Sequence, residues 1–126
     1  MGDSSYIVEA LLEDVSLLAK EQIVAPDVVV YEVANAIWKQ EHLMQHLKDG
    51  KLYTAIFHGL IESGKIEVIL PNENLMQDSY LVAKQNGITV YDAVFIALAL
   101  QLDLSLKTLD NIQARVFKSE SNKRAK

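Results

Sequence analysis

The chain has 126 residues, half of them hydrophobic and 23% charged, which describes one folded domain rather than a disordered segment. It contains no cysteine, and this excludes disulfides, zinc–thiolate sites and thiol catalysis. The formal net charge of −5 weighs against binding of nucleic acid through bulk electrostatic attraction. No apolar run approaches the roughly 20 residues that cross a bilayer, and the N-terminus lacks a signal-peptide pattern, so we expect a cytoplasmic protein.

Short β-rich segments alternate with amphipathic stretches along the chain, and turn residues such as Pro26, Pro71 and Gly87 separate them. This alternation predicts an α/β fold with a short, mostly parallel sheet. The expected strands cover residues 23–25, 66–70 and 104–108. The expected helices cover residues 4–14, 28–40, 52–62, 72–85 and 91–102, with a short helix ending at Glu21 and a last one ending near Phe117. With no internal repeat or linker, we expect a single domain over residues 1–118 and a polar, disordered tail over 119–126.

Four acidic residues follow apolar runs or lie in the helix after one, namely Asp3, Glu32, Asp92 and Asp110. Ligands of open α/β sheets bind at the edge where parallel strands end, so these side chains are expected to meet there. Hard divalent cations such as Mg²⁺ take oxygen ligands. Converging carboxylates repel one another unless a cation or protons neutralise them. The set therefore indicates a metal site.

Each acid alone also has a structural explanation. Thr89 and Asp92 match the Ser/Thr-x-x-acid capping pattern, and the helix dipole favours an acid in the first turn. Asp3 and Asp110 are equally plausible helix caps. Glu32 can be a solvated helix residue. The metal-site hypothesis therefore depends on the set of four rather than on any single member.

Several segments of the chain together match the motifs of a known protein family. They are, in order, Asp3-Ser4-Ser5, Ala25-Pro26 followed by Glu32-Val33-Ala34-Asn35-Ala36, Thr89-Val90-Tyr91-Asp92-Ala93, and Thr108-Leu109-Asp110. In this order the chain resembles the PIN domain family, and it is most similar to the small prokaryotic VapC-type toxin ribonucleases. The resemblance extends over essentially the whole chain, and the Tyr-Asp-Ala block is its most specific part.

The resemblance implies a three-layer α/β/α fold and a metal-dependent endoribonuclease that hydrolyses RNA phosphodiesters with Mg²⁺ or Mn²⁺. Asp3, Glu32, Asp92 and Asp110 would be the catalytic metal ligands, with Thr108 as a supporting hydroxyl near the metal. Asn35 would contact either a metal ligand or the substrate. It further implies a homodimer and a cognate VapB-type antitoxin whose C-terminal segment covers the acidic groove. Only Met1-Gly2 precede Asp3, so the first strand is expected to be truncated and Asp3 to be the weakest ligand.

Other features leave alternatives open. The truncated first strand is compatible with a non-catalytic PIN-like module that binds RNA or protein. A phosphatase-like enzyme ranks last, because no Asp-x-Asp follows a strand. An apolar stripe extends from Leu43 to Leu60 around a polar turn, and Trp38 and Tyr53 are candidate interface anchors. Lys39 lies two turns after Glu32 on the same helical face, where it can approach a substrate phosphate or remain solvated.

Overall fold

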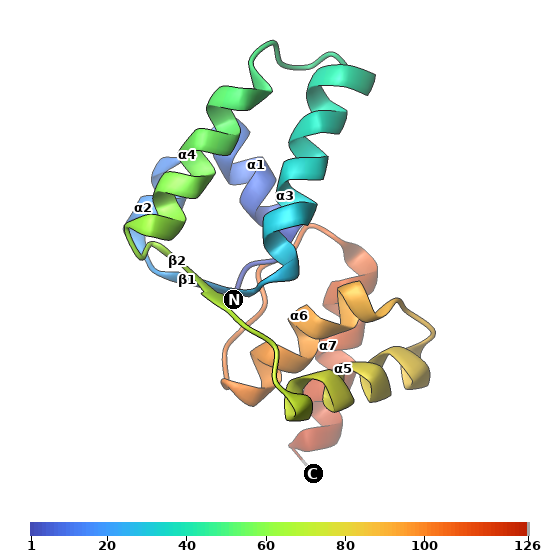
Figure 1. The fold of residues 1–126 in the computed structure, drawn as a ribbon. Coiled ribbons are helices and arrows are strands. Elements are labelled where there is room, and N and C mark those ends of the chain that lie inside the picture. The colour runs from blue at the N-terminus through green and yellow to red at the C-terminus, as the bar shows by residue number, and fades with distance from the viewer. Residues whose placement is uncertain (126) are drawn as a thin grey trace.

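A short parallel sheet lies between two groups of helices in the computed structural model, which describes residues 1–125. Helices α1 to α4 lie on one side of the sheet, and α5 to α7 lie on the other (Figure 1). The expected PIN-like α/β fold is therefore confirmed. The elements are α1 (Ser4–Glu13), α2 (Ser16–Lys20), β1 (Ile23–Pro26), α3 (Val28–Trp38), the π-helical turn η1 (Lys39–Leu43), α4 (Gly50–Glu62), β2 (Ile66–Ile69), α5 (Glu73–Asn86), α6 (Val90–Gln101) and α7 (Asn111–Arg124).

The first strand is reduced to a short pairing at residues 1–3. The Gly2 N–H donates to the Val24 carbonyl at 3.1 Å, which joins this segment to β1. On its other side, the Asp3 N–H donates to the Lys107 carbonyl at 3.1 Å, and the Lys107 N–H donates to the Met1 carbonyl at 2.9 Å. Residues 1–3 therefore lie between β1 and the segment around Lys107, and this position places Asp3 at the end of a central, very short strand.

Close packing, rather than backbone conformation, favours glycine at position 2. A Cβ atom on Gly2 would lie 3.0 Å from Cγ2 of Ile23 and 3.3 Å from Cδ1 of Tyr6. Both neighbours are side chains of the core and its margin. The absence of a side chain at Gly2 thus lets the first strand approach β1 and α1.

Helix α6 forms the centre of the core. Its residues Ala93 to Ala99 are all buried, and α6 packs against β1 on one side and α5 on the other. Alanines at several of these positions allow the close approach of neighbouring elements, while Phe95 fills the space beside the sheet. Because α6 is buried and packed on two sides, the position of Asp92 in its first turn is well defined.

Two sequence-based expectations differ from the structure. The strand expected over 104–108 is wrong, because within this segment only Lys107 forms a bridge, to Gly2. The polar tail expected from residue 119 is helical as far as Arg124, because Glu120 is buried against α5. Residue 126 lies outside the described residues, and the domain limits of 1–118 stay a prediction.

Helix α3 does not continue regularly to Gln40 as the sequence indicated. It ends at Trp38 and passes into the π turn η1, which is held by stacking of Trp38 on His42, with ring centroids 5.2 Å apart. The Glu41 carboxylate also accepts from the Gly50 N–H at 3.2 Å. Single π turns are frequent at functional sites, because they redirect the side chains on one face of a helix.

Within residues 1–125, no helix combines the length and the apolar character that a bilayer crossing requires.

Candidate active site

The sequence-predicted acids gather at the edge of the sheet where the parallel segments end. Asp3 follows the first strand, and Glu32 lies in the helix that follows β1. Asp110 comes three residues after the bridging Lys107. Asp92 approaches from the first turn of α6. This is the edge at which open α/β sheets bind ligands.

Asp3 is buried and fully engaged by hydrogen bonds. Its side chain is only 3% exposed, and Oδ1 accepts from the Ser5 hydroxyl at 2.6 Å and from the Tyr6 N–H at 3.0 Å. Its other oxygen, Oδ2, accepts from the Thr108 hydroxyl. Asp3 therefore caps α1 and links the first strand to Thr108, whose role as a supporting hydroxyl near the metal stays a prediction.

Glu32 is half-buried and lies in the field of two other acids. The Ser4 hydroxyl donates to its Oε1 at 2.5 Å. Burial raises the pKa of the Glu32 carboxyl above its usual value, and the nearby carboxylates of Asp92 and Asp3 raise it further, while the Ser4 hydrogen bond acts in the opposite direction. Three of the four predicted acids thus interact electrostatically at one place.

Gln113 forms hydrogen bonds to both Asp92 and Asp110. Its backbone N–H donates to Asp110 Oδ1 at 3.1 Å, and its side-chain Nε2 donates to Asp92 Oδ1 at 3.2 Å. The side chain of Gln113 is 4% exposed, and its Oε1 is a buried atom without a hydrogen-bond partner. Gln113 therefore fixes the position of Asp92 relative to Asp110.

Asp110 is exposed and caps α7. Its Oδ1 accepts from the Ile112 N–H at 2.8 Å as well as from Gln113, and its own N–H donates to Thr108 Oγ1 at 2.9 Å. Asp92 in turn lies in the cap of α6, where the Thr89 hydroxyl accepts from the Asp92 N–H at 3.2 Å. The expected capping arrangements at Asp3, Asp110 and Thr89 are all present. The same acids therefore both take part in helix caps and lie close to one another at this site.

Sequence reasoning missed Ser4 and Gln113 as parts of the site. Gln113 lies three residues after the helix cap Asp110, and this spacing predicts only the capping hydrogen bond to its backbone N–H. No local pattern could have paired Ser4 with Glu32, since the two lie 28 residues apart. Asn35, predicted as a substrate contact, lies beside Glu32 in the wall of a pocket.

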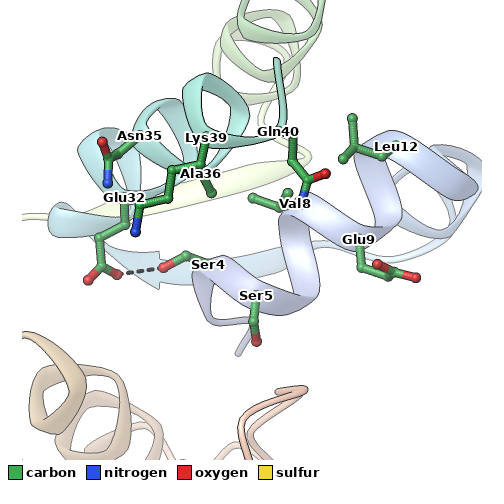
Figure 2. A pocket seen from close by; sticks show the side chains of 10 residues that line it. All are labelled: Ser4, Ser5, Val8, Glu9, Leu12, Glu32, Asn35, Ala36, Lys39 and Gln40. Atoms are coloured by element: carbon green, nitrogen blue, oxygen red, sulfur yellow. Dashed lines mark hydrogen bonds between the residues drawn. The ribbon is translucent and has the colours of Figure 1, made fainter. Parts of the chain in front are cut away.

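This pocket, with a volume of about 420 Å³, opens between α1 and α3 next to Glu32 (Figure 2). Its lining combines apolar, acidic, amide and hydroxyl side chains with one lysine. The residues are Ser4, Ser5, Val8, Glu9, Leu12, Glu32, Asn35, Ala36, Lys39 and Gln40. A volume of this size and a mixed lining are typical of small-molecule sites.

The chemistry of the donor set fits a hard divalent cation. The donors are carboxylate oxygens with a hydroxyl beside them, which Mg²⁺ and Mn²⁺ prefer. A cation near Glu32 would also offset the mutual repulsion that raises its pKa. In the side-chain positions observed, no group of three or more His, Asp or Glu residues among residues 1–125 is arranged to hold a metal ion. Asp110 is exposed and Asp92 partly so, and both can turn from their present partners toward a ligand.

Comparison with known proteins agrees with the fold. The sequence profile of the PIN domain family matches residues 3–118. The chain is also 33% identical over 91 residues to Ribonuclease VapC3 of Pyrobaculum aerophilum, an alignment that covers 72% of this chain and 68% of that protein. The chain belongs to the PIN domain family.

Proposed function

We propose that the protein is a divalent-metal-dependent endoribonuclease that hydrolyses RNA phosphodiesters, with Asp3, Glu32, Asp92 and Asp110 as its metal ligands. The observation that carries this proposal is the convergence of the acids at one edge of the sheet, where Thr108 links Asp3 to Asp110 and Gln113 links Asp110 to Asp92. The name of the relative, a ribonuclease, supports the reaction class. Mg²⁺ or Mn²⁺ bound to these oxygens would stabilise negative charge on the phosphoryl group and lower the pKa of a water molecule.

The surrounding residues position the acids. Ser4 donates to Glu32 Oε1 and so orients this carboxylate beside the other acids. Thr108 holds Asp3, and Gln113 holds Asp92, so that neither acid depends on the substrate for its position. Asn35, beside Glu32, is placed to contact the RNA.

The test is cleavage of a mixed panel of single-stranded and structured RNAs by the wild type and by Asp92→Asn, with Mg²⁺, with Mn²⁺ and with EDTA. We expect metal-dependent cleavage that Asp92→Asn loses while retaining the wild-type circular dichroism spectrum. Asp103→Asn is the matched control, because Asp103 is exposed and lies in the turn after α6, outside the site. Full activity of Asp92→Asn would remove Asp92 from the proposed ligands.

The same proposal includes the biological context. We propose that the chain is a cytoplasmic toxin, that it forms a homodimer, and that a VapB-type antitoxin inhibits it. The similarity to Ribonuclease VapC3 and the exposed aromatic residues Tyr31 and Trp38 on α3 support this view. Light scattering of the purified protein would test the dimer. Relief of growth inhibition when a neighbouring antitoxin gene is co-expressed would test the pairing.

A second candidate is a non-catalytic PIN-like module that binds RNA or protein. The burial of Asp3 favours it, because the hydrogen bonds from Ser5, Tyr6 and Thr108 already give this carboxylate a structural role without a metal. Tight RNA binding in EDTA, with no cleavage under either metal, would support this candidate over the nuclease.

A further inference from the structure

We propose that the pocket between α1 and α3 binds one unpaired ribonucleotide next to the cleaved bond, with Lys39 on its phosphate and Gln40 at its base. This inference rests on the proposed nuclease function and specifies how the substrate would lie. It assigns a substrate-binding role to Lys39 and Gln40, and it predicts that the nucleotide runs from the carboxylates along α3.

Lys39 is the positively charged side chain with which this pocket can bind a phosphate. Among the described residues that line the pocket, it alone is positively charged, while Glu9 and Glu32 are acidic. No carboxylate within residues 1–125 forms an ion pair with it. In Figure 2 its ammonium group extends along α3 toward Glu32, as expected for helical side chains, which point back toward the N-terminus. A polyanion approaching the acids would therefore meet Lys39 beside them.

The spacing along α3 suits a single nucleotide. Seven residues of helix separate Glu32 from Lys39, a rise of about 10 Å, and the lysine reaches back over part of this distance. The π turn η1 begins at Lys39, and the side chains of Lys39 and Gln40 both line the pocket.

The remainder of the pocket can hold a base. Val8, Leu12 and Ala36 form apolar walls, against which the face of a base can pack. The Gln40 side chain is oriented by His46, whose Nδ1 lies 3.0 Å from Oε1. Since Oε1 can only accept, Nδ1 carries the donated proton, and the Gln40 amide N–H groups remain available to an acceptor on the base edge.

Two variants and a control test the inference. Binding of a fluorescein-labelled pool of random single-stranded RNA 12-mers would be measured by anisotropy in EDTA at several salt concentrations, and cleavage of the same pool with Mg²⁺ or Mn²⁺. For Lys39→Met, which keeps the aliphatic stem, we expect about tenfold weaker binding and a KM raised by the same factor with kcat unchanged. The slope of log K against log salt should become shallower by about 0.7, the value for one phosphate contact in single strands. Lys39→Arg should restore binding.

Ala36→Leu should also raise KM by narrowing the pocket, but with the salt slope unchanged, because no charge is removed. Lys84→Met is the control, since Lys84 is exposed on α5 in the other half of the molecule. If the wild type cleaves RNA and both pocket variants bind and cleave like it, the inference is wrong while the nuclease stands. If the wild type neither binds nor cleaves the pool, both proposals fail together.

Discussion

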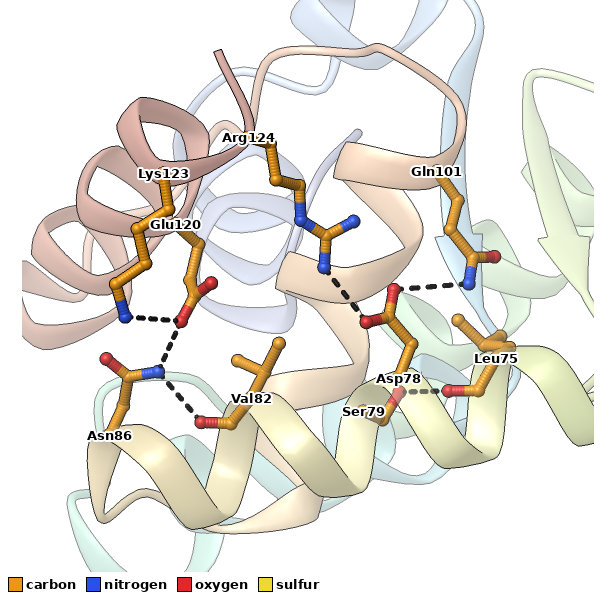
Figure 3. Close-up of polar contacts among 9 residues, drawn as sticks. All are labelled: Leu75, Asp78, Ser79, Val82, Asn86, Gln101, Glu120, Lys123 and Arg124. Carbon is orange, nitrogen blue, oxygen red and sulfur yellow. Dashed lines mark hydrogen bonds and ion pairs between the residues drawn. The ribbon is translucent and has the colours of Figure 1, made fainter. Parts of the chain in front are cut away.

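The last two turns of α7 are fixed to α5 by a small buried network, and breaking it should destabilise the fold (Figure 3). Glu120 is only 4% exposed, and its Oε1 accepts from Asn86 Nδ2 at 2.9 Å and from Lys123 Nζ at 3.4 Å. Asn86 Nδ2 also donates to the Val82 carbonyl at 2.8 Å near the end of α5. We expect that Asn86→Ala and Glu120→Ala both lower the free energy of unfolding.

The structure sets the size of each effect. Asn86→Ala removes the shorter hydrogen bond to a buried carboxylate, an interaction worth about 1.5–3 kcal/mol, and the remaining Lys123 contact places the loss near the lower end. Glu120→Ala should cost about 1 kcal/mol, because Asn86 keeps its bond to the Val82 carbonyl. The double variant should lose less than the sum of the two, by about 1 kcal/mol of coupling.

Urea unfolding followed by circular dichroism measures these losses of free energy. In thermal unfolding, a loss of about 1 kcal/mol lowers Tm by roughly 4 °C for a chain of this size. Asn122→Ala is the control, because Asn122 is exposed on the same helix, and it should stay within about 0.5 kcal/mol of the wild type. Wild-type stability for both Glu120→Ala and a chain ending at residue 118 would refute the reasoning, since residues 119–124 would then be the unpacked tail that their composition suggested.

Three further predictions concern the first strand and the acidic site. Gly2→Val should cost at least about 2 kcal/mol in urea unfolding, because its side chain would overlap Ile23. Gln113→Leu should lower kcat about tenfold with little change in KM, since it frees Asp92 without touching the pocket. Glu32→Gln should abolish cleavage yet stabilise the fold at neutral pH, because burial and neighbouring carboxylates raise the pKa of Glu32.

The sign of the Glu32 effect follows from proton linkage. A folded-state pKa above the unfolded one means that the folded protein binds more protons, so wild-type stability falls as pH rises from the ordinary Glu pKa through the raised value. The stability advantage of Glu32→Gln should therefore be largest at neutral pH and vanish below the ordinary Glu pKa. Unchanged cleavage by Gln113→Leu, or tolerance of valine at Gly2, would contradict the roles given to these residues.

The sequence by itself determined the features that depend on neighbours along the chain. Asp3, Thr89 and Asp110 cap the helices that follow them, because a cap needs only N–H groups two or three residues away. The alternation of apolar segments likewise predicted β1, β2 and most helices, since their periods are local properties. The order of the acids along the chain was sufficient to propose that they meet.

The tertiary structure decided what depends on residues that are distant in the sequence. Thr108 reaches Asp3 across 105 positions, and Ser4 reaches Glu32 across 28, through the pairing of parallel segments. The strand expected over 104–108 is reduced to one bridge, between Lys107 and Gly2, because a strand exists only where a partner segment pairs with it. Residues 119–124 became helix because burial of Glu120 against Asn86 outweighs their polar composition. Local patterns specify which groups a segment carries, whereas packing specifies which groups from other segments they meet.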